Sequence, residues 1–312
     1  MALKVSICIP VYKQVELLKK NLDLIFAQTF SDYELIITDD SPDDAVEKLI
    51  QQINSNNITY IHNRPALGAP ENWNFAMNLA KGAYIKILHQ DDFFATSESL
   101  EQFVKLLDNN PKADFCFSAT HVNAGGVSNK HQCTTADFNS LKKHPSLLVI
   151  KNSIGSPSAT IIRAAAFQKF DNNLKWLVDI DWYIRLIEKN SSIVYTTDGL
   201  IQSHHGSAEQ ITASVSTNKE ILIKEHVYLL ERNKTLLNNT LFAIHLQLLF
   251  NKYNIHTLED IKAIYAFNPS LHGYLERICI QKKSIPFFKK VYYWLHKLTV
   301  TDFLYLLKNR FR

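Results

Sequence analysis

The chain has 312 residues, enough for a large hydrophobic core and more than one packing unit. Hydrophobic residues make up 46% and charged residues 21%, values of an ordinary globular protein that exclude a fibrous or disordered chain. The net charge of +4 comes from residues 282–312, which hold eight Lys or Arg and one acid, whereas the rest holds 26 basic and 29 acidic residues. Positive charge is therefore not spread as on a nucleic-acid-binding protein, and we expect no nucleic-acid partner.

The cysteines and the hydropathy pattern indicate a cytoplasmic protein. Cys8, Cys116, Cys133 and Cys279 are too scattered for a zinc site and are expected to be buried thiols in a reducing compartment. No stretch approaches the ~18 consecutive apolar residues of a membrane-spanning helix. The N-terminus opens on a strand pattern and not on a signal peptide.

Strand and helix patterns alternate from residue 4 to about residue 110. Strands are expected at 4–11, 33–38, 58–62 and 84–88, with helices at 14–29, from about 44, and at 73–81. The alternation predicts a Rossmann-like, mostly parallel central sheet flanked by helices, with a ligand crevice at the carboxyl edge of the strands. Beyond it we expect strands at 113–122, 159–162 and 193–197, a helix at 176–188, a loop at 203–207 and helices from about 216.

Two pairs of carboxylates follow strands of this predicted sheet. Asp91 and Asp92 come directly after the fourth strand, and Asp39 and Asp40 follow the second. Both pairs would lie at the carboxyl edge, where adjacent acids repel each other unless a cation lies between them. A divalent metal that carries a diphosphate fits, because hard cations bind carboxylate and phosphate oxygens together. A solvated acidic turn, the simpler alternative, does not explain why both pairs lie at one edge.

Five ordered segments resemble family 2 inverting glycosyltransferases with the GT-A fold, over about residues 4–212. The segments are 5–12, 34–41, 68–85, 88–92 and 179–185. The resemblance implies transfer of a sugar from a nucleotide-sugar, expected to be a UDP-sugar, to a hydroxyl of a glycan or lipid-linked acceptor, with Mn²⁺ or Mg²⁺ as cofactor, in bacterial surface-polysaccharide assembly. We accordingly divide the chain into a GT-A catalytic domain, 1–215, and a helical C-terminal region, 216–312. The nucleotide-sugar half would span 1–112 and the acceptor half 113–215.

The resemblance also assigns roles to individual residues. Asp179 would be the general base, with Asp181 as its competitor. Arg185 would either flank the site or pair with Asp181 or Glu188. The nucleotide-binding residues are expected to be Pro10, Val11, Tyr12, Asp39, Asp40, Arg64, Asn72 and Gln90. The metal ligands are expected to be Asp91, Asp92 and His205, with His204 as the alternative to His205. His89 replaces the first acid of the family's Asp-X-Asp motif, and either ligates the metal or hydrogen-bonds the nucleotide.

Other functions fit the sequence less well. A sugar nucleotidyltransferase needs a Gly-rich loop where this chain has Pro10–Gln14, and a dinucleotide oxidoreductase needs a GxGxxG motif that is absent. A glycosyltransferase-like binding or scaffold protein remains open because of His89. Residues 287–298 form a basic amphipathic pattern, which predicts either a helix peripheral to the inner face of the cell membrane, on anionic lipid, or a helix that packs on the catalytic domain.

Overall fold

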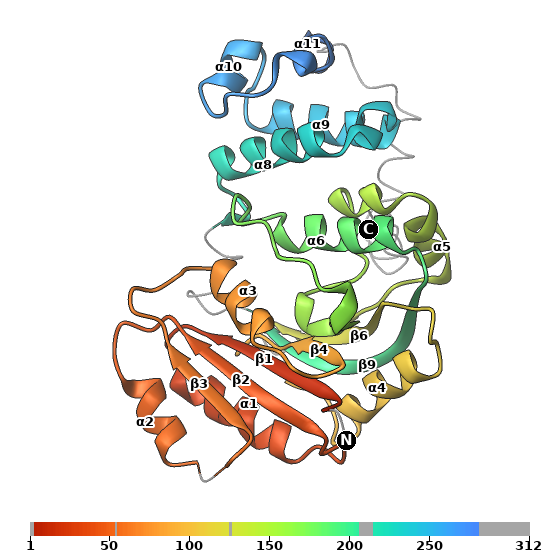
Figure 1. Ribbon diagram of the computed structural model, residues 1–312. Coiled ribbons are helices and arrows are strands. Elements are labelled where there is room, and N and C mark those ends of the chain that lie inside the picture. The colour runs from red at the N-terminus through yellow and green to blue at the C-terminus, as the bar shows by residue number, and fades with distance from the viewer. Residues whose placement is uncertain (1–2, 54, 125–126, 206–214, 281–312) are drawn as a thin grey trace. The chain divides into compact units, whose positions relative to one another are not determined.

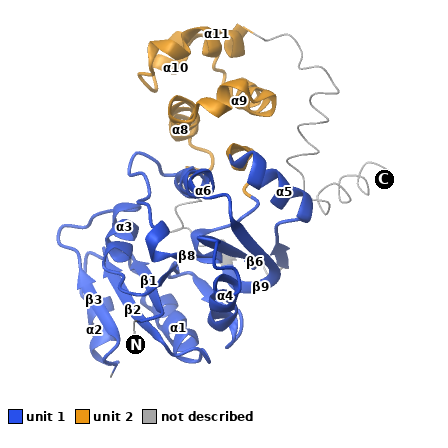
Figure 2. Ribbon diagram, turned by 45° about the vertical axis from the view of Figure 1, so that its right-hand side comes forward, with its two compact units in different colours: residues 1–145, 153–213 blue, residues 146–152, 214–312 orange. Residues whose placement is uncertain are grey.

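The computed structural model describes residues 3–53, 55–124, 127–205 and 215–280 (Figure 1). It divides the chain into two compact units, of which unit 1 comprises residues 1–145 and 153–213 (Figure 2). Unit 2 comprises residues 146–152 and 214–312. The predicted tail helix at 287–298 lies outside the described residues. In the described part of the chain, no helix is both long and apolar enough to cross a bilayer.

A mixed sheet of nine strands forms the centre of unit 1 as described. The strands are β1 (Val5–Val11), β2 (Tyr33–Asp39), β3 (Ile58–His62), β4 (Tyr84–Ile87), β5 (Asp92–Phe94), β6 (Phe115–Ala124), β7 (Val127–His131), β8 (Thr160–Arg163) and β9 (Ile193–His205). Their order is β3-β2-β1-β4-β8-β6-β9-β5, with β7 beside β6. The first four are parallel, as is the β6–β9 pair, whereas β5, β7 and β8 run antiparallel to their neighbours.

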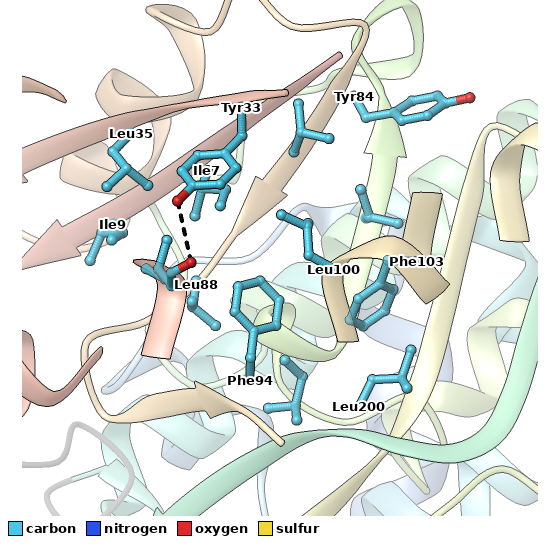
Figure 3. Packing of buried hydrophobic residues seen from close by; sticks show 14 of the residues in the cluster. Ile7, Ile9, Tyr33, Leu35, Tyr84, Leu88, Phe94, Leu100, Phe103 and Leu200 are labelled. Carbon is cyan, nitrogen blue, oxygen red and sulfur yellow. Dashed lines mark hydrogen bonds between the residues drawn. The ribbon is translucent and has the colours of Figure 1, made fainter. Parts of the chain in front are cut away.

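Helices cover both faces of this sheet because its central strands are apolar on both sides. The helices of unit 1 are α1 (Val15–Phe26), α2 (Ala45–Gln51), α3 (Glu71–Asn78), α4 (Ser99–Asp108), α5 (Thr135–Lys143) and α6 (Val178–Lys189). Ile7 and Ile9 of β1 join one core with residues of α1, α2 and α4, among them Phe103 (Figure 3). Cys8, between them in sequence, turns to the opposite face, where its thiol lies 3.5 Å from the Ala76 carbonyl of α3.

The helix expected at 73–81 begins and ends earlier, as α3 at Glu71–Asn78. It does not continue to Lys81 because the backbone N–H groups of Lys81 and Gly82 donate to the Ser6 hydroxyl, at 3.1 and 2.8 Å. A Cβ atom on Gly82 would lie 2.6 Å from the Ser6 backbone nitrogen. The close approach of β1 therefore ends this helix and requires glycine there.

The loop expected at 203–207 is wrong for Ser203, His204 and His205, which belong to β9. Asp92 of β5 pairs with Ser203, and β6 pairs with β9 on its other side through His205. β5 is only three residues long, and this end of β9 is polar, so neither has a strand pattern that can be recognised in the sequence. They are strands because two neighbouring backbones supply their hydrogen bonds.

Unit 2 is helical where it is described. Its helices are α8 (Lys219–Arg232), α9 (Thr240–Lys252), α10 (Leu258–Lys262) and α11 (His272–Ile280). Asn218 and Asn239 cap α8 and α9, each accepting a hydrogen bond from a backbone N–H of the first turn. Leu241 and Ile244 of α9 form a small core with Ile150. This helical region agrees with the pattern expected from about residue 216.

Candidate active site

The carboxyl ends of β1, β2 and β4 meet at one edge of unit 1. The register places Val11 opposite Asp39 on one side of β1 and Cys8 opposite Ile87 on the other. Each of these strands continues into a turn that carries residues predicted to bind the nucleotide or the metal. Since parallel strands end at the same edge, the fold brings these turns together, and that edge is the candidate site.

A pair of hydrogen bonds joins the turn after β1 to the acidic motif after β4. The Tyr12 backbone N–H donates to the Gln90 side-chain oxygen at 2.9 Å, and the Gln90 amide donates back to the Tyr12 carbonyl at 3.0 Å. Gln90 is buried, but the Tyr12 side chain is 52% exposed. Lys13 follows with a left-handed backbone, φ 57°, and its N–H donates to the Ser41 hydroxyl at 2.7 Å. The Tyr12 backbone is thus held in place while its ring remains available to a ligand.

Asp39 and Asp40 are both buried, and their carboxylates accept hydrogen bonds from the protein. Asp39 accepts from the Ser41 N–H at 2.8 Å and from the Tyr60 hydroxyl at 2.9 Å. Burial raises the pKa of Tyr60, and the hydrogen bond to Asp39 raises it further. Asp40 accepts from the N–H groups of Leu67 and Gly68, at 3.0 and 2.7 Å. These carboxylates therefore shape the turn after β2 and fix the 67–68 segment over it.

Asn72 and Arg64 lie beside this turn in different environments. Asn72 is buried, and its amide donates to the Thr38 carbonyl at 3.0 Å while its oxygen accepts from Asn63 at 3.0 Å. Arg64 is exposed and forms an ion pair with Asp44. Asn72 links α3 to the end of β2, whereas Arg64 sits at the rim.

The motif His89-Gln90-Asp91-Asp92 bridges β4 and β5 and presents polar atoms of different kinds. Asp92 is buried, and one of its oxygens accepts from the Ser156 hydroxyl at 3.1 Å; Asp91 is half-buried. The His89 ring packs on Trp73, with 4.6 Å between centroids, and its Nε2 atom is buried without a hydrogen-bond partner. Burial lowers the pKa of His89, although Asp92 and Asp91 oppose this, so the imidazole is held neutral. A neutral imidazole nitrogen without a hydrogen-bond partner is a ligand type suited to a divalent transition metal. Among the described residues, however, the group whose ligand atoms all lie within 4.8 Å of one another is Asp44, Glu47 and His62, and not His89, Asp91 and Asp92.

The backbone places His204 and His205 at the end of β9, next to β5 and β6. Their side chains lie outside the described residues, as do Gly206 and Ser207.

Both predicted candidates for the base, Asp179 and Asp181, lie on α6, but their surroundings differ. Asp181 is buried and forms an ion pair with Arg185, with 2.8 Å between Oδ2 and Nε. Burial raises the pKa of Asp181, and the Arg185 charge and hydrogen bond partly offset this. The Arg185 guanidinium also donates to the Lys169 carbonyl at 2.8 Å. This pair, one of the alternatives for Arg185, ties α6 to the chain at 168–169.

Trp182, three residues after Asp179 on α6, packs in the core of unit 1. It is fully buried, stacks on Phe170 at 4.5 Å between centroids, and donates from Nε1 to the Gln168 carbonyl at 2.7 Å.

Asp179 occupies the first turn of α6 and is half-buried. The next turn carries Tyr183, whose hydroxyl donates to the Gly155 carbonyl at 3.0 Å. Burial raises the pKa of Tyr183 well above its ordinary value, and the carboxylates of Asp179 and then Asp92 raise it further. Both carboxylates therefore act on one phenol. The helix that is predicted to carry the base and the turn that carries the acidic motif both contact the 155–158 segment.

Two residues of this region were not found from the sequence. Tyr183 reads as one more apolar position of an amphipathic helix. Lys86 is fully buried in β4, among residues that otherwise form a continuous apolar run. A lysine in the middle of a buried strand was the available signal, because buried lysines are rare without a specific partner.

A sequence comparison shows the family to which the chain belongs. The model of Glycosyl transferase family 2 matches residues 6–170, more than half of the chain. A relative from Escherichia coli, UDP-Glc:alpha-D-GlcNAc-diphosphoundecaprenol beta-1,3-glucosyltransferase WfaP, is 34% identical over 98 residues, which cover 31% of this chain and 39% of the relative.

Two solved structures resemble the fold. S. aureus TarS 1–349, in complex with UDP-GlcNAc, has a TM-score of 0.60 at 20% identity, covering 81% of this chain and 72% of that chain. The mannosyltransferase PcManGT from Pyrobaculum calidifontis, in complex with GDP-Man and Mn²⁺, has a TM-score of 0.52 at 14% identity, covering 94% and 84%.

The chain belongs to glycosyl transferase family 2 and has the GT-A fold. It is a glycosyltransferase, and the predicted family, fold and enzyme class are confirmed. Belonging to the family does not by itself identify the donor, the acceptor, the base or the metal.

Proposed function

We propose that the protein transfers a sugar, with inversion, from a UDP-sugar to a hydroxyl of a glycan or lipid-linked acceptor. The observation that carries this proposal is that the 155–158 segment contacts both α6, through Tyr183 and the Gly155 carbonyl, and the acidic motif, through the Ser156 hydroxyl and Asp92. One reaction needs a base for the acceptor on one side of the anomeric carbon and a site for the departing diphosphate on the other. Asp179, from α6, and the acidic motif, from the end of β4, supply these two groups from different elements.

Asp179 takes the proton of the acceptor hydroxyl as that oxygen attacks the anomeric carbon. A new carbon–oxygen bond forms, the bond between the anomeric carbon and the diphosphate oxygen breaks, and UDP leaves with the bonding electrons. A single displacement inverts the anomeric centre. Asp179 is half-buried in the first turn of α6, the position that the resemblance assigns to the base. Asp181 is unsuited because Arg185 engages it.

The nucleotide would lie over the turns after β1 and β2. Tyr12, exposed at the end of β1, contacts the base with its ring, and Pro10 and Val11 with their backbone. Gln90 fixes that backbone, and Arg64 lies within reach at the rim. Asp39, Asp40 and Asn72 act mainly by holding the turn, since their polar atoms already bond to the protein.

The motif is suited to a divalent cation, Mn²⁺ or Mg²⁺. Asp91 and Asp92 would hold it, with His205 or His204 from the end of β9 and the buried Nε2 of His89 as nitrogen donors. When bound, such a cation offsets the negative charge that develops on the departing diphosphate. The Mn²⁺ bound to the GDP-Man complex of PcManGT supports this assignment.

The relatives support the choice of donor and acceptor. The E. coli relative is named for a UDP-Glc donor and a diphosphoundecaprenol-linked acceptor, and TarS was solved with UDP-GlcNAc. A lipid-linked acceptor on the cytoplasmic face of the membrane fits the basic tail predicted at 282–312. We therefore propose a role in surface-polysaccharide assembly, peripheral to that membrane.

UDP release from a panel of UDP-sugars, with and without Mn²⁺ and with a lipid-diphosphate saccharide as acceptor, tests the function. We expect Mn²⁺-dependent release with at least one donor and an inverted product by NMR. Asp179→Asn should lower kcat by at least about 10³-fold and leave UDP affinity within about twofold. Glu188→Gln, at the exposed end of the same helix, is the matched control and should keep full activity.

A retained anomeric configuration would exclude the single displacement. UDP binding without turnover of any donor would instead favour the scaffold alternative.

A further inference from the structure

Lys86 is a buried ammonium inside the core of unit 1. Its side chain is 0% exposed in the middle of β4. The ammonium donates to the Ile87 carbonyl at 3.0 Å and to the Ser158 carbonyl, and it lies 5.0 Å from the ring centre of Phe103. Among the ion pairs of the described residues, none joins it to a carboxylate.

A lysine is not needed here for packing. Methionine has a stem of nearly the same length and fills such a space without burying a charge, which is costly in a low-dielectric core. Burial lowers the pKa of Lys86 to about 7, and the negative charge of Asp92 only partly opposes this. Because burying the amino group of Lys86 is unfavourable, we expect this residue to have a function other than filling space in the core.

The Ser158 carbonyl belongs to a short segment, 155–158, that joins three parts of the site. The Ser158 hydroxyl accepts from the His89 N–H at 2.9 Å, and the Ser156 hydroxyl donates to Asp92 at 3.1 Å. The Gly155 carbonyl accepts from the Tyr183 hydroxyl of α6 at 3.0 Å. The segment thus contacts both ends of the acidic motif and the helix that carries Asp179.

We propose that Lys86 is a positioning residue of the transferase site: its ammonium holds the Ser158 carbonyl and so fixes the 155–158 segment against His89 and Asp92. The hydrogen bonds of Lys86 within the described residues go to the Ile87 and Ser158 carbonyls and not to the motif itself. This inference rests on the proposed function for its kinetic consequence, but its structural consequence can be measured without turnover.

Lys86→Met tests the proposal, with Lys105→Met, an exposed lysine on α4, as the matched control. We expect kcat to fall about 10- to 100-fold, because small displacements of a site cost this much. KM for the UDP-sugar should change less than threefold, because the Tyr12–Gln90 contact is untouched. Lys105→Met should change neither parameter.

Ser158→Ala removes only the hydroxyl that meets His89 and supplies a second variant that keeps the fold. It should lower kcat in the same direction, and the double variant Lys86→Met/Ser158→Ala should be no slower than Lys86→Met alone. Full additivity of the two effects would overturn the proposed connection through Ser158.

Hydrogen exchange supplies the readout that does not depend on turnover. In Lys86→Met, amides of the 155–160 segment should exchange at least about tenfold faster, while those of α2 keep their rates. If the wild-type protein transfers no sugar, the proposed function fails and exchange alone decides the role of Lys86. Unchanged exchange at 155–160, or unchanged kcat in an active enzyme, would overturn the proposal.

Discussion

Replacing Lys86 with Met should change how the stability of unit 1 depends on pH. Burial lowers the pKa of Lys86 from 10.5 to about 7 in the folded protein, whereas the unfolded chain keeps the ordinary value. At pH 6 both states carry the proton, and the folded state bears the whole cost of the buried charge. As pH rises from about 7 toward 10.5, the folded state releases its proton first. The unfolded state then binds more protons, so the wild-type protein gains stability with rising pH.

The gap between these pKa values, about 3.5, limits the total gain to roughly 5 kcal/mol at ~1.4 kcal/mol per pH unit. Between pH 6 and pH 9 only about half of this range is crossed. The wild-type protein should therefore gain about 2.5 kcal/mol relative to Lys86→Met over that interval. All other ionisable groups are common to the two proteins, so their contributions largely cancel in the difference.

Urea unfolding at pH 6, 7, 8 and 9 measures this difference for wild type, Lys86→Met and Lys105→Met. Three of the four tryptophans, Trp73, Trp176 and Trp182, belong to unit 1, so tryptophan fluorescence mainly reports the unfolding of that unit. The Lys105→Met curve should run parallel to the wild-type curve. A difference between wild type and Lys86→Met that stays constant with pH would refute the reasoning, since it would mean that Lys86 titrates alike in both states.

Three further substitutions test other parts of the structure. Gln90→Ala should raise KM for the donor about tenfold, because two hydrogen bonds that hold Tyr12 are lost, whereas Gln52→Ala on the surface should have no effect. Gly82→Ala should lower the stability of unit 1 by about 1–3 kcal/mol in urea, since its Cβ would meet backbone 2.6 Å away, while Gly273→Ala, with nothing within 4 Å, should not destabilise unit 2. His89→Ala should weaken Mn²⁺ binding to the UDP complex about tenfold by calorimetry; unchanged affinity would restrict the cation to carboxylates.

The sequence predicted the parallel half of the sheet well because β1, β2 and β4 are buried on both faces. Such strands are short apolar runs, and helices with a clear period separate them. The antiparallel part was harder. Asp92–Phe94 and Ser203–His205 are strands only because neighbouring backbones pair with them, and pairing between distant segments leaves no local pattern.

For the site, residue type predicted which groups carry charge but not which of them are already engaged. Asp40 and Asn72 resemble ligand-binding residues in sequence, yet their polar atoms bond to the chain itself. Asp181 is engaged in the same way, by Arg185 on the next turn of the helix. Distinguishing such cases requires distances. The role of Lys86 could not be predicted from the sequence either, because its hydrogen-bond partner Ser158 is distant along the chain.

The paired hydrogen bonds between Gln90 and Tyr12 have a consequence for substrate choice. A side-chain amide here makes the two contacts that a neighbouring strand would make, and so extends the sheet one residue beyond the end of β1. The backbone beneath the Tyr12 ring is ordered before any nucleotide arrives, and a ligand need not spend binding free energy to order it. Discrimination between nucleobases would then depend on what the ring and its surroundings contact, and exchanging side chains at position 12 would be a direct way to alter donor preference.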